Sequence, residues 1–251
     1  MALHKEWLLP FASVIRKHAI GGPAFALGDQ QTLFTAPYAL KRLGAAGLIA
    51  NPAAQIAPDH IHPECISFRS VLGLLGIDGY TDIDMNGHAS LNIDLGKPLP
   101  EEHYGIAGSV FDLGTLEHVF DIGEAFRNIC RLLRPGGSVI HFSPITAYNH
   151  GLWNVTPQLF FGFYGINEFD VLDQGIIFPP FYTLWSSLVG PVIKQETVRK
   201  RSGGRFVVRV DSQSKAFQYF CNFCFHPARM YLFFAARKRS SSSDVKTFYQ
   251  V

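Results

Sequence analysis

The sequence predicts an α/β fold with a doubly wound, mostly parallel sheet of seven strands. Short, mostly apolar runs at 24–27, 108–113 and 138–142 are typical of strands that are covered on both faces. A helical pattern at 117–133 separates the last two runs, and Pro135-Gly136-Gly137 ends it. Alternating strand and helix signals predict a parallel sheet with a ligand site at the carboxyl ends of its strands.

The remaining segments complete this plan. Apolar residues at positions 8, 11, 14 and 15 recur at helical spacing, so an amphipathic helix is expected near the start. Further strands are expected at 80–85 and 91–93, and a helix at 66–75. The runs 205–210 and 230–235 are expected to close the sheet, with an antiparallel pair at its edge as one arrangement.

Composition and charge exclude several classes of protein. The chain has 22 basic and 20 acidic side chains, so its net charge of +2 creates no field that would attract nucleic acid or an anionic membrane. Four cysteines are too few for a disulfide scaffold, and the first residues lack the pattern of a leader peptide. Prolines interrupt the uncharged run 174–193, which argues against a membrane span. We expect a cytoplasmic protein with a small substrate.

Two motifs carry a resemblance to a known family. Residues 113–120 read Leu-Gly-Thr-Leu-Glu-His-Val-Phe, and residues 129–137 read Ile-Cys-Arg-Leu-Leu-Arg-Pro-Gly-Gly. Together they resemble class I S-adenosylmethionine-dependent methyltransferases, in which the first motif follows the fourth strand and the second precedes the fifth. Residues 231–238 are similar to the last strand of that family. The resemblance covers roughly 24–144 and implies a Rossmann-like fold that binds S-adenosylmethionine and releases S-adenosylhomocysteine.

The resemblance also implies which acids contact the cofactor. A carboxylate at the end of the second strand can accept hydrogen bonds from both ribose hydroxyls, and we prefer Asp82 for this role, with Asp84 close behind. Asp94 resembles the position that contacts adenine, and Leu95 would lie against the base; a solvated turn aspartate is the alternative for Asp94.

The end of the fourth strand supplies three further expected contacts. Asp112 would help to hold the sulfonium group or the substrate, and Gly114 lets the backbone approach the cofactor closely. Thr115 follows directly and is expected to contact the cofactor as well. Glu117 suits a helix start on electrostatic grounds alone, so a structural role is open for it.

The first loop departs from the pattern of the family. Where the family has two or three glycines, this chain has one, in Gly28-Asp29-Gln30. Either Asp29 and Gln30 take over polar contacts to the cofactor, or cofactor binding has been lost. The loop resembles that of a subgroup with a degenerate first glycine loop, which favours the first alternative. The chain also lacks the G-x-G-x-x-G pattern of nicotinamide-dependent dehydrogenases.

Methyl transfer to oxygen requires a base near the loop that follows the fifth strand. His150 is the first choice because histidine titrates near neutral pH, and Tyr148 and His141 are weaker choices. His118 is a further catalytic candidate. For His150 and for His118, a structural hydrogen bond is the alternative interpretation.

We expect one domain over residues 1–251. It divides into an N-terminal helix (1–20), a cofactor-binding core (21–145), an aromatic-rich cap insertion (146–200), closing strands (201–239) and a tail (240–251). The cap is inferred because residues 141–193 contain twelve aromatic side chains and only three charged ones. A packed subdomain or a dimer interface would have the same composition.

The sequence therefore predicts methyl transfer to an oxygen or nitrogen of a small, partly aromatic or apolar molecule. The alternative is a catalytically silent methyltransferase-like partner subunit in an oligomer, and a homodimer is compatible with either function. A third hypothesis is an RNA methyltransferase that uses the basic cluster at 199–209, although a solvated hairpin explains this cluster better. The CxxC pair Cys221 and Cys224 has no second matched pair, so no metal site is predicted.

Overall fold

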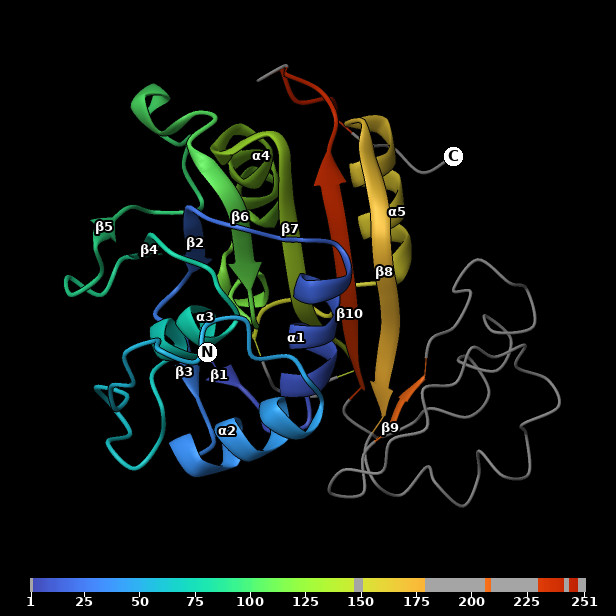
Figure 1. The fold of residues 1–251 in the computed structure, drawn as a ribbon. Coiled ribbons are helices and arrows are strands. Elements are labelled where there is room, and N and C mark those ends of the chain that lie inside the picture. Colours follow the sequence, from blue (N-terminus) through green and yellow to red (C-terminus); the bar gives the residue numbers. More distant parts are fainter. Residues whose placement is uncertain (1, 147–150, 179–205, 209–229, 242–243, 248–251) are drawn as a thin grey trace, which may run out of the picture.

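The fold is described from a computed structural model, which covers residues 2–146, 151–178, 206–208, 230–241 and 244–247 (Figure 1). Its helices are α1 (Leu8–Lys17), α2 (Ala36–Ala45), α3 (Phe68–Leu74), α4 (Ile122–Leu132) and α5 (Pro157–Ile166), with short 3₁₀ turns η1 (Glu101–His103) and η2 (Leu116–His118). Its strands are β1 (Ala2–Leu3), β2 (Ala24–Leu27), β3 (Gln31–Thr32), β4 (Tyr80–Asp84), β5 (Leu91–Asn92), β6 (Ala107–Asp112), β7 (Leu133–Thr146), β8 (Phe169–Phe178), β9 (Phe206–Val208) and β10 (Met230–Lys238).

The main sheet has the strand order β5-β4-β2-β6-β7-β10-β8-β9. The five strands from β5 to β7 are parallel, whereas β10 runs antiparallel between β7 and β8. The chain builds outward from β2 to β4 and β5, and then returns to the other side of β2 with β6 and β7. This order confirms the doubly wound, Rossmann-like α/β fold. Seven of its strands correspond to predicted ones, including β9 at one edge, and β8 is the additional strand.

Each face of the sheet is covered by its own helices, as Figure 1 shows. Side chains alternate along each strand, so neighbouring residues enter different cores. Ala24 and Ala26 of β2 pack with α1 and α3 on one face, and Phe25 and Leu27 belong to the core with α4 and α5 on the other. The burial of the central strands on both faces explains why their sequences are mostly apolar.

Capping residues set the helix starts, and two helices differ from the sequence prediction. The expected helix at 117–133 is split: η2 comes first, and α4 begins only after Asp121, whose side chain accepts a hydrogen bond from the backbone N–H of Glu124 at 2.9 Å. Helix α2 was not predicted. Thr35 caps it, and Pro37 lies in its first turn, where proline is tolerated.

Part of the segment that was expected to form a cap belongs to the main fold. Helix α5 supplies Phe160 and Tyr164 to the core beside α4, and β8 pairs with β10 over residues 169–177. Together with Phe163 and Phe169, these aromatic side chains belong to the core between the sheet and α5. Residues 179–200 of the expected cap lie outside the described residues. The pairing expected at the edge is corrected too, because β9 pairs with β8 and β10 lies inside the sheet.

The tail that was expected after residue 240 is partly docked. The side-chain amide of Asn167 donates to the carbonyl of Lys246 at 3.2 Å, and its oxygen accepts from the backbone N–H of the same residue at 2.8 Å. Val245 packs against the core on the α4 and α5 side. A single asparagine thus pairs with the tail as a neighbouring strand would.

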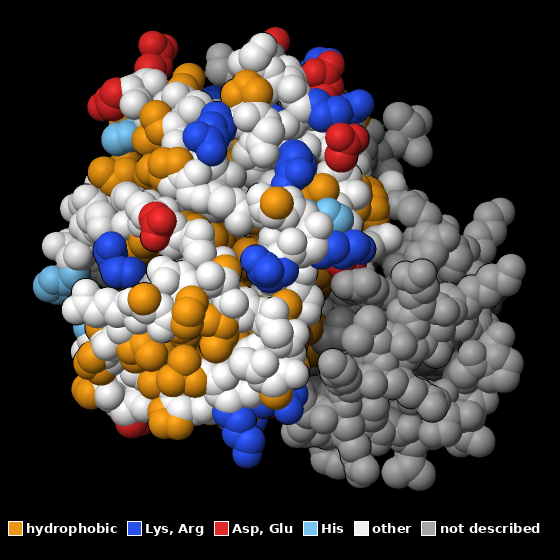
Figure 2. All heavy atoms as spheres, in the orientation of Figure 1, with side chains coloured by type: hydrophobic (Ala, Val, Ile, Leu, Met, Phe, Trp, Pro, Cys, Tyr) orange, Lys and Arg blue, Asp and Glu red, His pale blue; other side chains and the backbone are white. Residues whose placement is uncertain are grey.

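Charged side chains are interspersed on the face that carries α1, α2 and α3. Figure 2 shows lysine and arginine side chains there among neutral and hydrophobic ones, with no continuous basic stripe. Among the described residues, no helix has both the length and the apolar character that a membrane crossing requires.

The start of β6 depends on a glycine for close packing. A Cβ atom on Gly108 would lie 2.3 Å from the carbonyl oxygen of Gly22, whereas one on Gly165 of α5 would meet no atom within 4 Å. Backbone atoms cannot yield as a flexible side chain can. Gly108 is therefore required where β6 passes the segment that leads into β2.

We predict that Gly108→Ala lowers the free energy of unfolding by roughly 1–3 kcal/mol or more, because the added methyl group overpacks against backbone. Gly165→Ala is the matched control and should raise it by about 0.5–1 kcal/mol, since alanine is the better helix former. Urea titration followed by circular dichroism measures both. Equal midpoints for the two variants would contradict the assigned packing.

Candidate functional site

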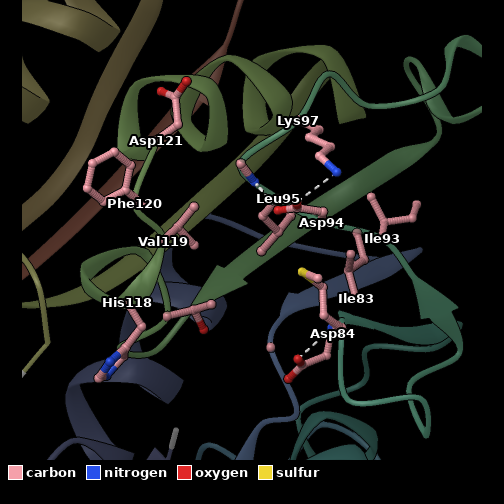
Figure 3. A pocket seen from close by; sticks show the side chains of 14 residues that line it. Ile83, Asp84, Ile93, Asp94, Leu95, Lys97, His118, Val119, Phe120 and Asp121 are labelled. Carbon is pink, nitrogen blue, oxygen red and sulfur yellow. Dashed lines mark hydrogen bonds and ion pairs between the residues drawn. The ribbon is translucent and has the colours of Figure 1, made fainter.

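A pocket of about 400 Å³ lies where the strand order reverses, at the carboxyl ends of β2, β4, β5 and β6. This volume falls within the range of small-molecule sites. In Figure 3, the side chains of 118–121 lie on one side of the pocket, and those that follow β4 and β5 lie on the other. The lining residues are Gly28, Ile83, Asp84, Met85, Ile93, Asp94, Leu95, Gly96, Lys97, Thr115, His118, Val119, Phe120 and Asp121.

The first loop turns at Gly28, which has a φ of 76° and lines the pocket. Its backbone N–H donates to the carbonyl of Ile83 at 2.7 Å, and the N–H of Asp29 donates to Oδ2 of Asp84 at 2.9 Å. The same loop approaches a distant segment, because Nε2 of His60 lies 2.9 Å from Oδ2 of Asp29. One glycine in the left-handed region is therefore enough to turn the chain beneath the pocket.

Gln30 connects the first loop to the loop after β6. Its side chain is buried, and its amide nitrogen donates to the carbonyl of Leu27 and to Oγ1 of Thr115 at 3.0 Å. The hydroxyl of Thr115 in turn donates to the carbonyl of Leu27. Thr115 itself lines the pocket. Gln30 of the first loop thus connects the two walls of the site.

The two acids of β4 have different surroundings. Asp84 lines the pocket, and its Oδ1 accepts from the backbone N–H of Met85 at 2.6 Å. Oδ1 of Asp82 accepts from the backbone N–H of Ser90 at 3.2 Å and from its hydroxyl at 2.5 Å, which ties it to the turn before β5. Asp84 lies two residues further toward the carboxyl edge. The preference for Asp82 is therefore reversed in favour of Asp84.

Asp94 and Leu95 both line the pocket, at its end beyond β5. Oδ1 of Asp94 accepts from the backbone N–H of Gly96 at 2.9 Å, and Oδ2 lies 3.6 Å from Nζ of Lys97. Leu95 is buried and contributes to the core on the α4 side. With Val119 it provides apolar walls between the two carboxylates (Figure 3).

Asp112 does not line the pocket but lies fully buried beneath it. Its Oδ1 accepts from the backbone N–H groups of Thr115 at 2.9 Å and Leu116 at 3.2 Å, and its Oδ2 lies 2.7 Å from Nδ1 of His141. Nε2 of His141 lies 2.7 Å from the hydroxyl of Tyr164. Asp112, expected to contact the cofactor or the substrate, and His141, a weaker choice for the base, are thus both bonded within the interior in this structure.

The remaining site predictions fall in two groups. Gly114 has a φ of 99°, which allows the sharp turn after β6, and His118 lines the pocket. His150 and Tyr148, the other catalytic candidates, lie outside the described residues. The CxxC pair Cys221 and Cys224 lies outside them as well.

Val119, Phe120 and Asp121 were missed because the helix was expected to begin at residue 117. The signal that reveals them is the spacing Asp121-x-x-Glu124, which is a capping pattern that places the helix start later. Phe120 is 82% exposed at the rim of the pocket. Nε1 of Trp153 donates to the carbonyl of Val119 at 3.0 Å, so the segment that follows β7 supports this rim.

Glu117 is buried in η2 at the edge of the site. Burial, together with the nearby Asp112 carboxylate, raises its pKa from 4.5 to about 8. Its backbone carbonyl accepts from the N–H groups of Leu152 and Trp153, at 2.6 and 3.2 Å. A Cβ atom on Gly151 would lie 2.8 Å from Cγ of Glu117, so the segment after β7 packs tightly on this side chain.

Comparisons with known proteins add the following. No protein-family profile matches the sequence, and no curated protein matches it. Among solved structures, a candidate methyltransferase of Bacillus halodurans has 10% identity and a TM-score of 0.43, over 91% of this chain and 98% of the other. The 1,6-didemethyltoxoflavin-N1-methyltransferase of Burkholderia thailandensis, solved with S-adenosylhomocysteine, has 11% identity and a TM-score of 0.43, over 94% and 80%. The fold assignment rests on the observed strand order.

We predict that Glu117 makes the stability of the protein depend on pH. A folded-state pKa above the unfolded value means that the folded chain holds an extra proton between pH 4.5 and about 8. The contribution of Glu117 to the free energy of unfolding is therefore complete below pH 4.5 and is lost as pH rises through 8. Over this interval the free energy of unfolding falls by at most ~1.4 kcal/mol per pH unit. Glu117→Gln should flatten this decline.

Urea titrations of both proteins at pH 5, 6, 7 and 8 measure the effect. Glu102→Gln, which removes an exposed carboxylate from η1, is the control. If the difference in the free energy of unfolding between the wild type and Glu117→Gln is the same at every pH, the Glu117 carboxyl does not hold an extra proton in the folded state.

Proposed function

We propose that this protein is a class I S-adenosylmethionine-dependent methyltransferase. The observation that carries the proposal is the pair of carboxylates Asp84 and Asp94, which follow adjacent parallel strands and line one pocket at the switch point of the sheet. Ligands of doubly wound folds bind at this point, and acids here accept hydrogen bonds from a nucleoside. The motifs at 113–120 and 129–137 support the same family.

The chemistry of the lining fits a nucleoside cofactor. Asp84 would accept hydrogen bonds from ribose hydroxyls, and Asp94 would accept one from the amino edge of adenine. Leu95 and Val119 offer apolar walls for the faces of the base. Gly28 leaves room for the part of the cofactor that would pass over the first loop. Asp29 and Gln30 would act by holding that loop to Asp84 and Thr115.

Bound here, the cofactor supplies a methyl group that is already activated on a sulfonium. The protein then has to orient the acceptor and exclude water, with a base where the acceptor loses a proton. We retain His150 as the first choice for this base, with Tyr148 and His118 as alternatives. Of these, His118 lines the pocket.

We propose a small, partly aromatic or apolar acceptor that is methylated on oxygen or nitrogen. Two exposed apolar side chains, Leu152 and Trp153, follow the loop after β7 and are held against η2 through the carbonyl of Glu117. An apolar surface beside the pocket favours such an acceptor. The nearly balanced net charge disfavours nucleic acid.

Isothermal calorimetry with S-adenosylhomocysteine tests the cofactor. The wild type should bind it at micromolar concentration. Asp84→Asn should weaken binding by roughly tenfold or more, because a charged acceptor for two hydroxyls is lost. Asp82→Asn is the matched control, since the Asp82 carboxyl is tied to Ser90, and its affinity should stay within about twofold of the wild type.

Failure of the wild type to bind S-adenosylhomocysteine at high micromolar concentration would refute the proposed function. Light scattering then separates the alternatives. A cofactor-independent oligomer would favour the catalytically silent partner subunit.

His150→Ala tests the proposed base. This variant should bind S-adenosylhomocysteine as the wild type does but transfer methyl groups about 10²-fold more slowly or worse, the usual contribution of a general base. Transfer is measured with radiolabelled S-adenosylmethionine and a panel of small phenols and aromatic amines. Unchanged turnover would remove His150 from the mechanism and direct the test to His118→Gln.

A further inference from the structure

A chain of buried polar side chains runs from helix α5 to the edge of the pocket. Tyr164 of α5, His141 of β7 and Asp112 of β6 are each fully buried. The Tyr164 hydroxyl lies 2.7 Å from Nε2 of His141, and Nδ1 of His141 lies 2.7 Å from Oδ2 of Asp112. The parallel register that pairs Asp112 with His141 brings the last two together.

The series of hydrogen bonds continues into the loop after β6, which forms a wall of the pocket. Oδ1 of Asp112 accepts from the backbone N–H groups of Thr115 at 2.9 Å and Leu116 at 3.2 Å. The hydroxyl of Thr115, which lines the pocket, donates to the carbonyl of Leu27 and accepts from the amide of Gln30 at 3.0 Å. One unbroken series of hydrogen bonds therefore joins α5 to both loops of the site.

The partners determine where the protons lie. A carboxylate only accepts, so Nδ1 of His141 carries the proton that it donates to Asp112. Nε2 then accepts from the hydroxyl of Tyr164. Burial raises the pKa of Tyr164 well above its ordinary value, which keeps this donor protonated. Each hydrogen bond of the series therefore has an assigned donor and acceptor.

Packing holds the series in a single arrangement. The ring of Tyr164 stacks on Phe234 with centroids 5.6 Å apart, and His141 meets the edge of Phe160 at 4.9 Å. A buried carboxylate is costly unless its acceptor sites are filled, and the donors of Asp112 include two from the loop itself. The loop cannot move away from the pocket wall without leaving Asp112 short of donors.

We propose that Tyr164 is a positioning residue, whose hydroxyl fixes the Thr115 loop through His141 and Asp112 and thereby shapes the pocket. Tyr164 is not among the residues that line the pocket, so its effect on a ligand is indirect. The consequence for the cofactor rests on the proposed function, whereas the effect on the loop does not.

Hydrogen exchange in the ligand-free protein tests the effect on the loop. Tyr164→Phe keeps the ring and removes only the hydroxyl, and the amides of Thr115 and Leu116 should then exchange roughly fivefold faster or more, the factor of about one lost hydrogen bond. Tyr38→Phe, which removes a hydroxyl bonded to the carbonyl of Lys5, is the matched control and should leave both amides unchanged. Unchanged exchange in Tyr164→Phe would overturn the proposal.

Nitrogen NMR of the His141 ring provides a second test that does not need the Tyr164 variant. The wild type should carry the ring proton on Nδ1. In Asp112→Asn an amide N–H can face Nδ1, so the proton should move to Nε2 and the ring should donate to Tyr164. A wild-type ring protonated on Nε2 alone would overturn the assigned direction of the series and, with it, the proposal.

Titration with S-adenosylhomocysteine separates this proposal from the proposed function. Tyr164→Phe should bind it roughly threefold to tenfold more weakly, and the ring signals of wild-type His141 should shift on binding although His141 lies beneath the pocket. If the wild type binds, but the variant binds equally well and His141 does not respond, the positioning role is wrong and the function stands. If the wild type does not bind, the function is wrong and the exchange experiment still decides the role in the loop.

Discussion

The reversal of strand order between β2 and β6 is the constraint on which the site depends. Parallel strands end at the same edge, so the loops after β2, β4, β5 and β6 must converge there. Asp84 at the end of β4, with Gly28, Asp94 and Thr115 from the loops after β2, β5 and β6, therefore lines one pocket. The antiparallel strand β10 extends the sheet and leaves this edge unchanged, because it pairs on the far side of β7.

Burial of polar groups gives the same edge its rigidity. A sheet covered on both faces has no water to offer Asp112, so the loop that follows β6 and the histidine opposite on β7 must supply its donors. The conformation of the loop after β6 is therefore held both by Asp112 in the core and by Gln30 of the first loop.

The segment after β7 is anchored differently. The carbonyl of Glu117 accepts from two successive backbone N–H groups after β7, and Gly151 permits the close approach. This contact holds Leu152 and Trp153 against η2, and the ring N–H of Trp153 also donates to the carbonyl of Val119, which lines the pocket. A buried, protonated carboxyl at this point is compatible with dense packing, which an ionised one would oppose.

The sequence by itself determined the fold class and the strands at 24–27 and 108–113, and it proposed a set of cofactor-binding candidates that includes Asp84, Asp94 and Thr115. Apolar runs, glycine turns and motif spacing report burial and chain reversal, which are local properties. Only the tertiary structure decided that Asp84 and not Asp82 lines the pocket, that Asp112 bonds to His141, and that the aromatic residues of 160–169 fill a core layer. These outcomes depend on strand length, register and the neighbour across the sheet, and no local pattern encodes a neighbour that is tens of residues away.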